Sequence, residues 1–167
     1  QVPLPQMAGQ SAGQFLKSAG PSAANLWAYP PGYELDYVEF TGQVTQTATT
    51  EGAATTVVTG SSVAYDGSTV VAIEYFAPYM DPNATNGANI VTVLYDGAAS
   101  IGLMASVNAP QGTIALYVPV HAVRRLTPSA ASHTYSIRVY GSQTGGVVGA
   151  GAGGSGNVMP GFIRITK

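Results

Sequence analysis

The stretch that decides the fold is HTYSIRVY, residues 133–140, in which apolar and polar side chains alternate. Successive side chains of an extended chain point to opposite faces, so Tyr135, Ile137 and Val139 share one face. Tyrosine, isoleucine and valine also suit a pleated, half-buried surface. The stretch therefore predicts a β-strand with one buried face.

Similar signals recur from residue 33 to the end of the sequence, and no window indicates a long helix. The Asp-Gly pairs at residues 66–67 and 96–97 each predict a tight hairpin turn. Pro78 and Pro82 open a segment that predicts a long exposed loop up to Asn89. The expected strands are residues 33–40, 44–50, 55–59, 70–76, 90–95, 101–107, 113–118 and 162–166. About ten short strands of this kind predict an all-β sandwich, barrel or jelly roll.

Residues 1–28 differ from the rest, because they are rich in Gln, Ala, Ser, Gly and Pro and lack a sustained helical stripe. We expect an extended N-terminal arm that is ordered where its apolar residues dock on a partner. Pro30, Pro31 and Gly32 would close the arm, since prolines hold an extended backbone and glycine permits a turn. The head domain then spans residues 29–167. The docking residues of the arm would be Leu4, Met7, Phe15, Leu16, Leu26 and Trp27.

Charged residues are scarce, at 8% of the chain against roughly 25% in an ordinary soluble domain. A freely diffusing monomer would have little charge to keep it apart from its neighbours, so the composition predicts a covered surface. The strands also carry more apolar side chains than one inner face needs, and a trimer or similar assembly would bury the excess. The basic residues form no stripe for a phosphate backbone, and the apolar runs are too short for a membrane span. We therefore expect no nucleic acid and no membrane insertion.

No sequence pattern indicates catalysis or metal binding. The chain has no cysteine, His121 and His133 lack metal-ligand spacing, and neither a nucleophile elbow nor a phosphate loop is present. Glu74 and a loop aspartate could still meet in space as a glycosidase pair, which leaves a polysaccharide hydrolase as a remote alternative. We expect a protein without enzymatic activity, metal or cofactor.

The glycine-rich run at residues 145–156 has two interpretations. Such runs are usually flexible loops. Glycine in a strand, however, marks a place where another backbone approaches closely, such as a symmetry axis. In that second interpretation Val147, Val148, Gly149 and Gly151 would contact a neighbouring subunit.

Exposed loops suggest a different role, the binding of a host-surface glycan. The chain has ten tyrosines, whose flat apolar rings carry a polar tip and suit sugars, although half-buried strand positions are the more common use. The loops at residues 82–89 and 108–112 contain the candidate receptor residues Asn83, Asn86, Asn89 and Asn108. A glycan-binding adhesion module is therefore the alternative to a structural role.

Several short segments, in their order along the sequence, resemble virion structural proteins of tailed bacteriophages, in particular C-terminal domains of minor tail or fibre-type proteins. They are GYELDYVEFT (32–41), TATTE (47–51), YDGST (65–69), RRLTPS (124–129), SHTYSIR (132–138), GAGAGGSG (149–156) and FIRITK (162–167). The arm, with residues 13–18 and a later Leu26-Trp27, is similar to the connector that precedes such domains.

The resemblance implies a jelly-roll β-sandwich, similar in architecture to tumour necrosis factor and complement globular heads, that forms a homotrimer. It implies a place on the virion surface, as a capsid decoration protein, head spike or tail fibre domain, and it supplies no catalytic residues. Our leading expectation is a non-enzymatic virion structural protein. Its head associates with its own copies, and its arm docks on the major capsid or a tail protein.

Overall fold

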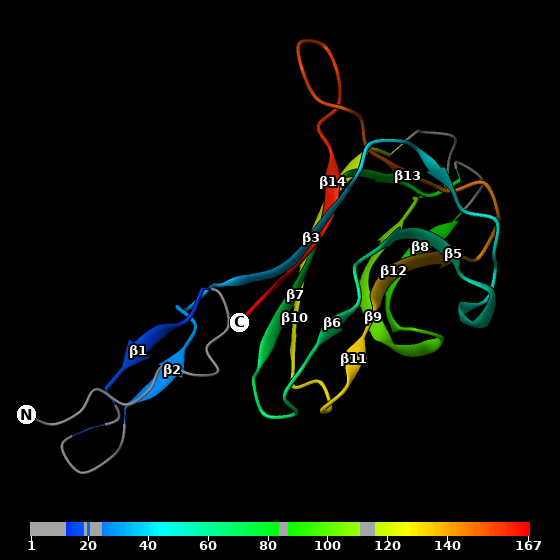
Figure 1. Cartoon of the computed structure of the whole chain (residues 1–167). Coiled ribbons are helices and arrows are strands. Elements are labelled where there is room, and N and C mark those ends of the chain that lie inside the picture. Colours follow the sequence, from blue (N-terminus) through cyan, green and yellow to red (C-terminus); the bar gives the residue numbers. More distant parts are fainter. Residues whose placement is uncertain (1–12, 19, 21–24, 84–86, 111–115) are drawn as a thin grey trace, which may run out of the picture.

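The computed structural model describes residues 13–18, 20, 25–83, 87–110 and 116–167 (Figure 1). Within these residues the chain is all-β apart from a short 3-10 helix, η1 (Glu51–Ala53). None of the described segments is a helix long and apolar enough to cross a membrane. The expected fold class is confirmed.

Two antiparallel sheets form the head. The first sheet contains, in spatial order, β3 (Glu34–Phe40), β14 (Gly161–Thr166), β7 (Val71–Asp81) and β10 (Val118–Leu126). The second sheet contains β5 (Thr55–Thr59), β12 (Tyr135–Gly141), β8 (Asn89–Asp96) and β9 (Ala99–Asn108). Short strands complete the head: β4 (Val44–Thr45) and β13 (Val147–Gly149) extend the first sheet, while β6 (Val63–Ala64) pairs with β11 (Ser132–His133).

The order of pairing identifies the sandwich as a jelly roll. Among these eight main strands of the described chain, the first pairs with the last, as β3 with β14, and the second with the seventh, as β5 with β12. The third then pairs with the sixth, as β7 with β10, and the fourth with the fifth, as β8 with β9. Such nesting arises when one long hairpin wraps around a common core, which is the jelly-roll arrangement.

The core lies between the two sheets. The first sheet contributes Ile73, Tyr75 and Ile163, and the second contributes Leu94 and Ile137, all fully buried. The alternation in residues 133–140 is confirmed, because its apolar set faces inward. Each buried aliphatic side chain of this kind contributes about 1.5–3 kcal/mol to stability.

Residues 46–54 of the chain itself cover the outer face of the second sheet. A second apolar cluster lies there and consists of Val91, Val93, Tyr95, Ala54 and Tyr140. The Tyr95 hydroxyl donates to the carbonyl oxygen of Glu51 in η1, and the Arg138 guanidinium lies 4.1 Å from the centre of the Tyr95 ring. Much of the apolar excess in residues 90–95 is therefore buried within the chain and needs no second subunit.

The outer face of the first sheet carries no such cover among the described residues. Three aromatic rings follow one another across it, with centroids 5.3 Å apart for Tyr37 and Phe162 and 5.6 Å apart for Phe76 and Phe162. Tyr37 is 42% exposed. This face is open to solvent or to a partner.

Glu74 organises the charges of that open face. One carboxylate oxygen lies 2.5 Å from Arg164 Nη2, and the other lies 2.7 Å from His121 Nε2. Partial burial alone would raise the pKa of Glu74, but the hydrogen bonds from His121 and Arg164 and their charge hold that pKa below its ordinary value. Glu74 is therefore a structural ion-pair partner on this sheet.

Strand β7 corrects the expectation of a loop after residue 76, because it runs through Pro78 to Asp81. Proline cannot donate to a sheet and is tolerated at bulges. Here the register of β10 shifts opposite residues 77–80, and on the other side of β7 the partner changes from β14, up to Phe76, to β13, from Tyr79. Pro78 therefore lies where the pairing of β7 is interrupted with both of its neighbouring strands.

The two Asp-Gly signals have different outcomes. Asp96 pairs with Ala99 across the turn between β8 and β9, so this hairpin is confirmed. The hairpin expected at residues 66–67 is wrong, because β6 pairs with β11 whereas β7 pairs with β10. Asp66 instead closes a loop on itself by accepting hydrogen bonds from Ser68 and Thr69.

Two further strand expectations are corrected. Strand β4 ends at Thr45, because the chain then leaves the first sheet to cross the second. The strand expected at residues 113–118 falls largely outside the described residues, and the observed strand β10 begins at Val118 and continues to Leu126.

Candidate functional site

A two-stranded hairpin stands beside the head (Figure 1). It pairs β1 (Phe15–Lys17) with β2 (Leu26–Ala28) and lies within the expected 1–28 arm. Phe15, Leu16 and Leu26 are 43%, 52% and 61% exposed, although such side chains are normally buried. Of the other expected docking residues, Trp27 is half-buried, whereas Leu4 and Met7 lie outside the described residues.

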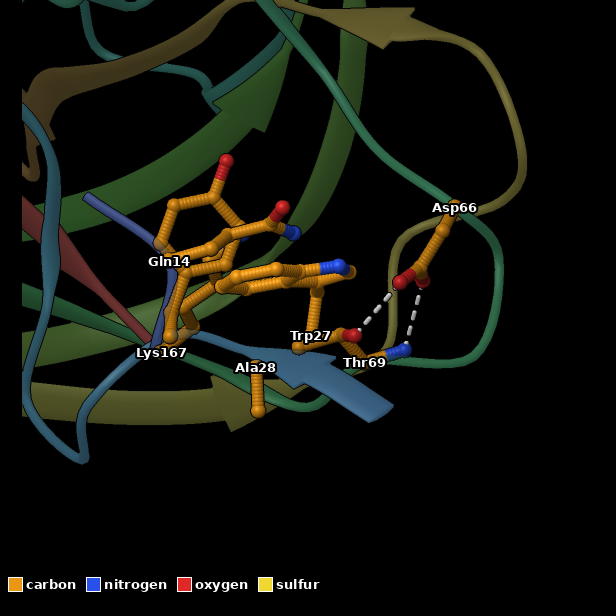
Figure 2. Close-up of a pocket in the computed structure, with 7 residues that line it drawn as sticks. Gln14, Trp27, Ala28, Asp66, Thr69 and Lys167 are labelled. Atoms are coloured by element: carbon orange, nitrogen blue, oxygen red, sulfur yellow. Dashed lines mark hydrogen bonds between the residues drawn. The ribbon is translucent and has the colours of Figure 1, made fainter. Parts of the chain in front are cut away.

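A cavity of about 330 Å³ lies where the hairpin meets the head. Figure 2 shows the Trp27 side chain between Gln14 and Lys167 on one side and Thr69 and Asp66 on the other. Seven residues line it: Gln14, Trp27, Ala28, Tyr29, Asp66, Thr69 and Lys167. They come from the hairpin, from the loop before β7 and from the last position after β14, so the site forms only in the folded chain.

Tyr29 and Lys167 form one wall of the cavity. Lys167 Nζ lies 3.4 Å from the centre of the Tyr29 ring, where the negative face of the ring attracts a cation. The Tyr29 ring lies 4.5 Å from that of Tyr33, and the backbone of Tyr33 exchanges hydrogen bonds with that of Lys167, 3.1 and 3.0 Å long. These contacts tie the hairpin end of the chain to β14.

Asp66 forms the opposite, acidic wall. Its carboxylate accepts hydrogen bonds from the Thr69 hydroxyl at 2.6 Å and from the backbone N–H groups of Thr69 and Ser68 at 2.7 and 2.8 Å. These bonds, the Thr69 hydroxyl foremost, hold the pKa of Asp66 well below its ordinary value. Asp66 therefore presents a fixed negative charge that can still accept further hydrogen bonds.

The cavity combines flat apolar surface with polar groups. The rings of Trp27 and Tyr29 can pack against an apolar ring face, while Gln14, Thr69 and Asp66 offer donors and acceptors at the rim. This combination suits a saccharide. The sequence places these residues far apart and provided no signal that they meet.

A second exposed apolar patch lies along the edges of the two sheets. Leu103 on β9, Tyr117 just before β10 and Val123 on β10 are 58%, 65% and 56% exposed. The two strands are neighbours, since the Arg124 side chain lies against Gly102. We name these three residues the edge patch.

The glycine-rich run behaves as a strand at its start. Val148 and Gly149 are buried in β13 between β4 and β7, and a β-carbon at Gly149 would overlap the Tyr79 ring. A β-carbon at Gly151 would lie 2.5 Å from the carbonyl oxygen of Val158. The chain's own residues thus make close approaches at Gly149 and Gly151, and contact of Val147, Val148, Gly149 and Gly151 with a neighbouring subunit stays a prediction.

Gln46 holds this run in place. It is fully buried, and its backbone N–H donates to the carbonyl oxygen of Gly146 over 2.7 Å. Its side-chain oxygen accepts from the N–H of Gly146, and its side-chain amide donates to the carbonyl oxygen of Ala48. The same residue thus anchors the start of the segment that covers the second sheet.

The candidate receptor asparagines serve the fold in part. Asn83 donates to the carbonyl oxygen of Thr144 over 2.6 Å, and Asn89 accepts from the N–H of Ser142 over 2.8 Å. Asn108 is exposed at the end of β9, and Asn86 lies outside the described residues. Asn83 and Asn89 therefore hold loops of the head in place, and the receptor role of these four asparagines stays a prediction.

The titratable side chains that the structure describes offer few candidates for a catalytic or metal site. No group of three or more histidine, aspartate or glutamate side chains in the described residues could hold a metal ion. Glu74, the carboxylate considered for a glycosidase pair, has basic partners on both oxygens. One hydrogen-bonded chain that sequence reasoning missed joins Ser129, His133 and Asp96.

No protein-family model matches the chain, and no curated protein matches it. Among solved structures the chain is similar to the infectious bursal disease virus Gt strain, with a TM-score of 0.42 and 9% identity over 99% of this chain and 46% of that chain. The infectious bursal disease virus VP2 subviral particle gives a TM-score of 0.40 and 9% identity, over 92% of this chain and 42% of that chain. The chain thus spans less than half the length of these viral chains.

A carbohydrate-binding module is also similar in fold. The C-terminal CBM6 of LamC from Zobellia galactanivorans gives a TM-score of 0.29 and 14% identity, over 78% of this chain and 99% of that chain. At such scores and identities the likeness concerns the jelly-roll fold and carries no functional conclusion. The function has to be argued from the chain's own surfaces.

Proposed function

We propose that the chain is a structural protein of a viral particle, with a jelly-roll head that associates with its own copies and a hairpin that anchors it to another particle protein. The observation that supports this most is the gathering of exposed apolar side chains at two places, the hairpin and the edge patch. Large apolar side chains left exposed in this way favour association with other molecules.

The hairpin needs a partner for its stability. A hairpin of two three-residue strands is marginal in water on its own, and here Phe15, Leu16 and Leu26 remain exposed even with the head present. Burial of these side chains in a groove of a particle protein would contribute about 1.5–3 kcal/mol each. The proposed partner is the major capsid or a tail protein of a tailed bacteriophage.

The edge patch supports self-association of the head. Strands β9 and β10 lie at the edges of their sheets in the described chain, and unpaired edges template association with other chains. Charge is scarce, so little repulsion opposes the contact. A closed homo-oligomer, for which we expect a trimer, would cover Leu103, Tyr117 and Val123.

Analytical ultracentrifugation of the whole chain at micromolar concentration tests self-association. We expect a species of three times the 17.0 kDa chain mass, and a monomer for the double variant Leu103→Lys/Val123→Lys. Val70→Lys, at an exposed apolar position outside the patch, is the matched control and should leave the oligomer intact. A wild-type chain that sediments as a stable monomer contradicts the proposal.

The anchor is tested separately with Phe15→Ser/Leu16→Ser/Leu26→Ser. This variant should keep the head oligomer but fail to enter particles when it is co-expressed with the other particle proteins. Mass spectrometry of purified particles measures the incorporated chain. Incorporation equal to that of the wild type would show that the hairpin is not the anchor.

The cavity favours a second candidate function, the binding of a host-surface glycan. Its support is the combination of Trp27 and Tyr29 with polar groups at the rim. In a glycan-array assay, Trp27→Ala should abolish binding, whereas Tyr37→Ala, which removes an exposed ring on the first sheet, should not. Absence of binding by the wild-type chain to every glycan would leave the structural role alone.

A further inference from the structure

Ser129, His133 and Asp96 form a continuous hydrogen-bonded chain at one end of the sandwich. Asp96 ends β8, His133 ends β11, and Ser129 lies in the loop between β10 and β11. Ser129 Oγ lies 3.0 Å from His133 Nε2, and His133 Nδ1 lies 2.5 Å from Asp96 Oδ2. The order and the distances are those of a nucleophile, a base and a group that orients the base.

The two imidazole nitrogens face the partners that this chemistry requires. A carboxylate can only accept, so the contact with Asp96 places a proton on Nδ1 of His133 and leaves Nε2 able to accept the Ser129 hydroxyl proton. In this tautomer Nε2 has no proton to donate to the carbonyl oxygen of Ser129, which lies 3.2 Å away. The partner of Nε2 is therefore the Ser129 hydroxyl, 3.0 Å away.

The base is enclosed while the nucleophile is open. The side chains of His133 and Asp96 are 14% and 27% exposed, and Ser129 is exposed. The Tyr135 ring stacks on the imidazole at 6.0 Å, and the Tyr65 ring meets it edge-on at 5.7 Å. These rings hold the imidazole in one orientation and keep water from its faces, whereas an electrophile can reach Ser129 from solvent.

The backbone N–H of Ala130, the residue that follows Ser129, is the candidate donor for a developing oxyanion, and its nitrogen lies beside Gly67. Serine hydrolases commonly use the N–H directly after the nucleophile for this purpose. Ser129 is exposed and does not line the cavity beside Trp27, so the site suits a small acyl group displayed on a larger molecule.

We propose that Ser129 is an activated nucleophile that hydrolyses exposed esters of small acyl groups, such as acetyl. Ser129 Oγ bonds to the acyl carbon while its proton passes to His133 Nε2. The ester C–O bond then breaks, and the leaving alkoxide takes that proton from Nε2. Water next gives a proton to Nε2 and its hydroxide to the acyl carbon, and Ser129 leaves with the proton as the carboxylic acid forms.

A fluorophosphonate probe tests the nucleophile directly in the whole chain. Ser129 Oγ would bond to phosphorus, fluoride would leave with the P–F electron pair, and the hydroxyl proton would pass through His133 to water. We expect labelling that peptide mass spectrometry maps to Ser129 and a labelling rate that falls about 100-fold or more in Ser129→Ala and His133→Gln. Ser132→Ala, at an exposed serine that begins β11, is the matched control and should label at the wild-type rate.

Asp96→Asn separates a positioning role from a merely structural one. In a variant with wild-type unfolding behaviour, the labelling rate should fall about tenfold or more and its dependence on pH should change. Hydrolysis of p-nitrophenyl acetate should follow the same order across the variants. Absence of labelling in the folded wild-type chain, labelling that persists in Ser129→Ala, or an Asp96→Asn rate and pH profile equal to wild type would overturn the proposal.

Discussion

The outer faces of the two sheets differ in how their side chains are kept compatible with solvent. On the second sheet, residues 46–54 fold over Val91, Val93 and Tyr95 and bury them. On the first sheet, the equivalent positions hold Tyr37 and the ion pairs of Glu74, which remain compatible with solvent. The excess of apolar residues in a strand therefore indicates an intramolecular cover as readily as an intermolecular one.

The largest expected difference between the two faces is in the free energy of unfolding when one aromatic ring is removed from each face. Tyr95→Ala should destabilise the chain by about 3–5 kcal/mol, because it leaves a cavity under η1 and removes the hydroxyl donated to Glu51. Tyr37→Ala, its matched control on the open face, should cost less than about 1 kcal/mol. Urea unfolding measures both free energies, and equal losses would mean that the open face is covered too.

A smaller loss of stability is expected when Gln46, which holds the start of the covering segment, is replaced. Gln46→Leu should cost about 1–3 kcal/mol, because the buried N–H of Gly146 and the carbonyl oxygen of Ala48 lose their side-chain partner. Gln43→Leu, at an exposed position just before β4, should change the free energy of unfolding by about 0.5 kcal/mol or less. Similar costs for both variants would show that the cover does not depend on Gln46.

The smallest expected effect is the pH dependence of the stability that Glu74 contributes on the open face of the first sheet. The folded-state pKa of Glu74 is depressed, so its contribution to stability is present above the ordinary value of 4.5 and is lost as pH falls through the folded-state pKa. Glu74→Gln should therefore be less stable than wild type at pH 7, by about 1 kcal/mol, and this gap should narrow toward pH 3. Unfolding at both pH values tests it, and a constant gap would mean that the carboxylate charge contributes nothing.

The sequence predicted the fold where one physical signal acts alone. In β12 the alternation fixes which side chains face the core, and at residues 96–97 the glycine makes the hairpin. It failed where two neighbours act together. Pro78 stays in β7 because the partners on both sides change register there, and no local pattern records that.

The candidate sites were less predictable than the fold. The cavity joins residues as distant as Gln14 and Lys167, which only the pairing of β3 with β14 brings together. Asp96 had a sufficient explanation as a turn residue, so its contact with His133, 37 positions away, left no trace in the pattern. The apolar residues of the hairpin could be singled out from the sequence. They stand in a segment that has no helix or strand pattern through which they would be buried.

The loop at residues 150–160 projects from one end of the head, and the hairpin lies at the other end (Figure 1). Strand β14 starts at the end of this loop and ends at Thr166, next to Lys167 in the cavity wall. The loop and the hairpin therefore lie at opposite ends of one strand (Figure 1). The tip of the loop is a tight turn in which the N–H of Asn157 donates to the carbonyl oxygen of Gly154. Exposed tips of this kind tolerate inserted sequence. A peptide inserted after Gly154 would therefore be displayed at the end of the head remote from the hairpin, which makes the head a scaffold for presenting foreign sequence.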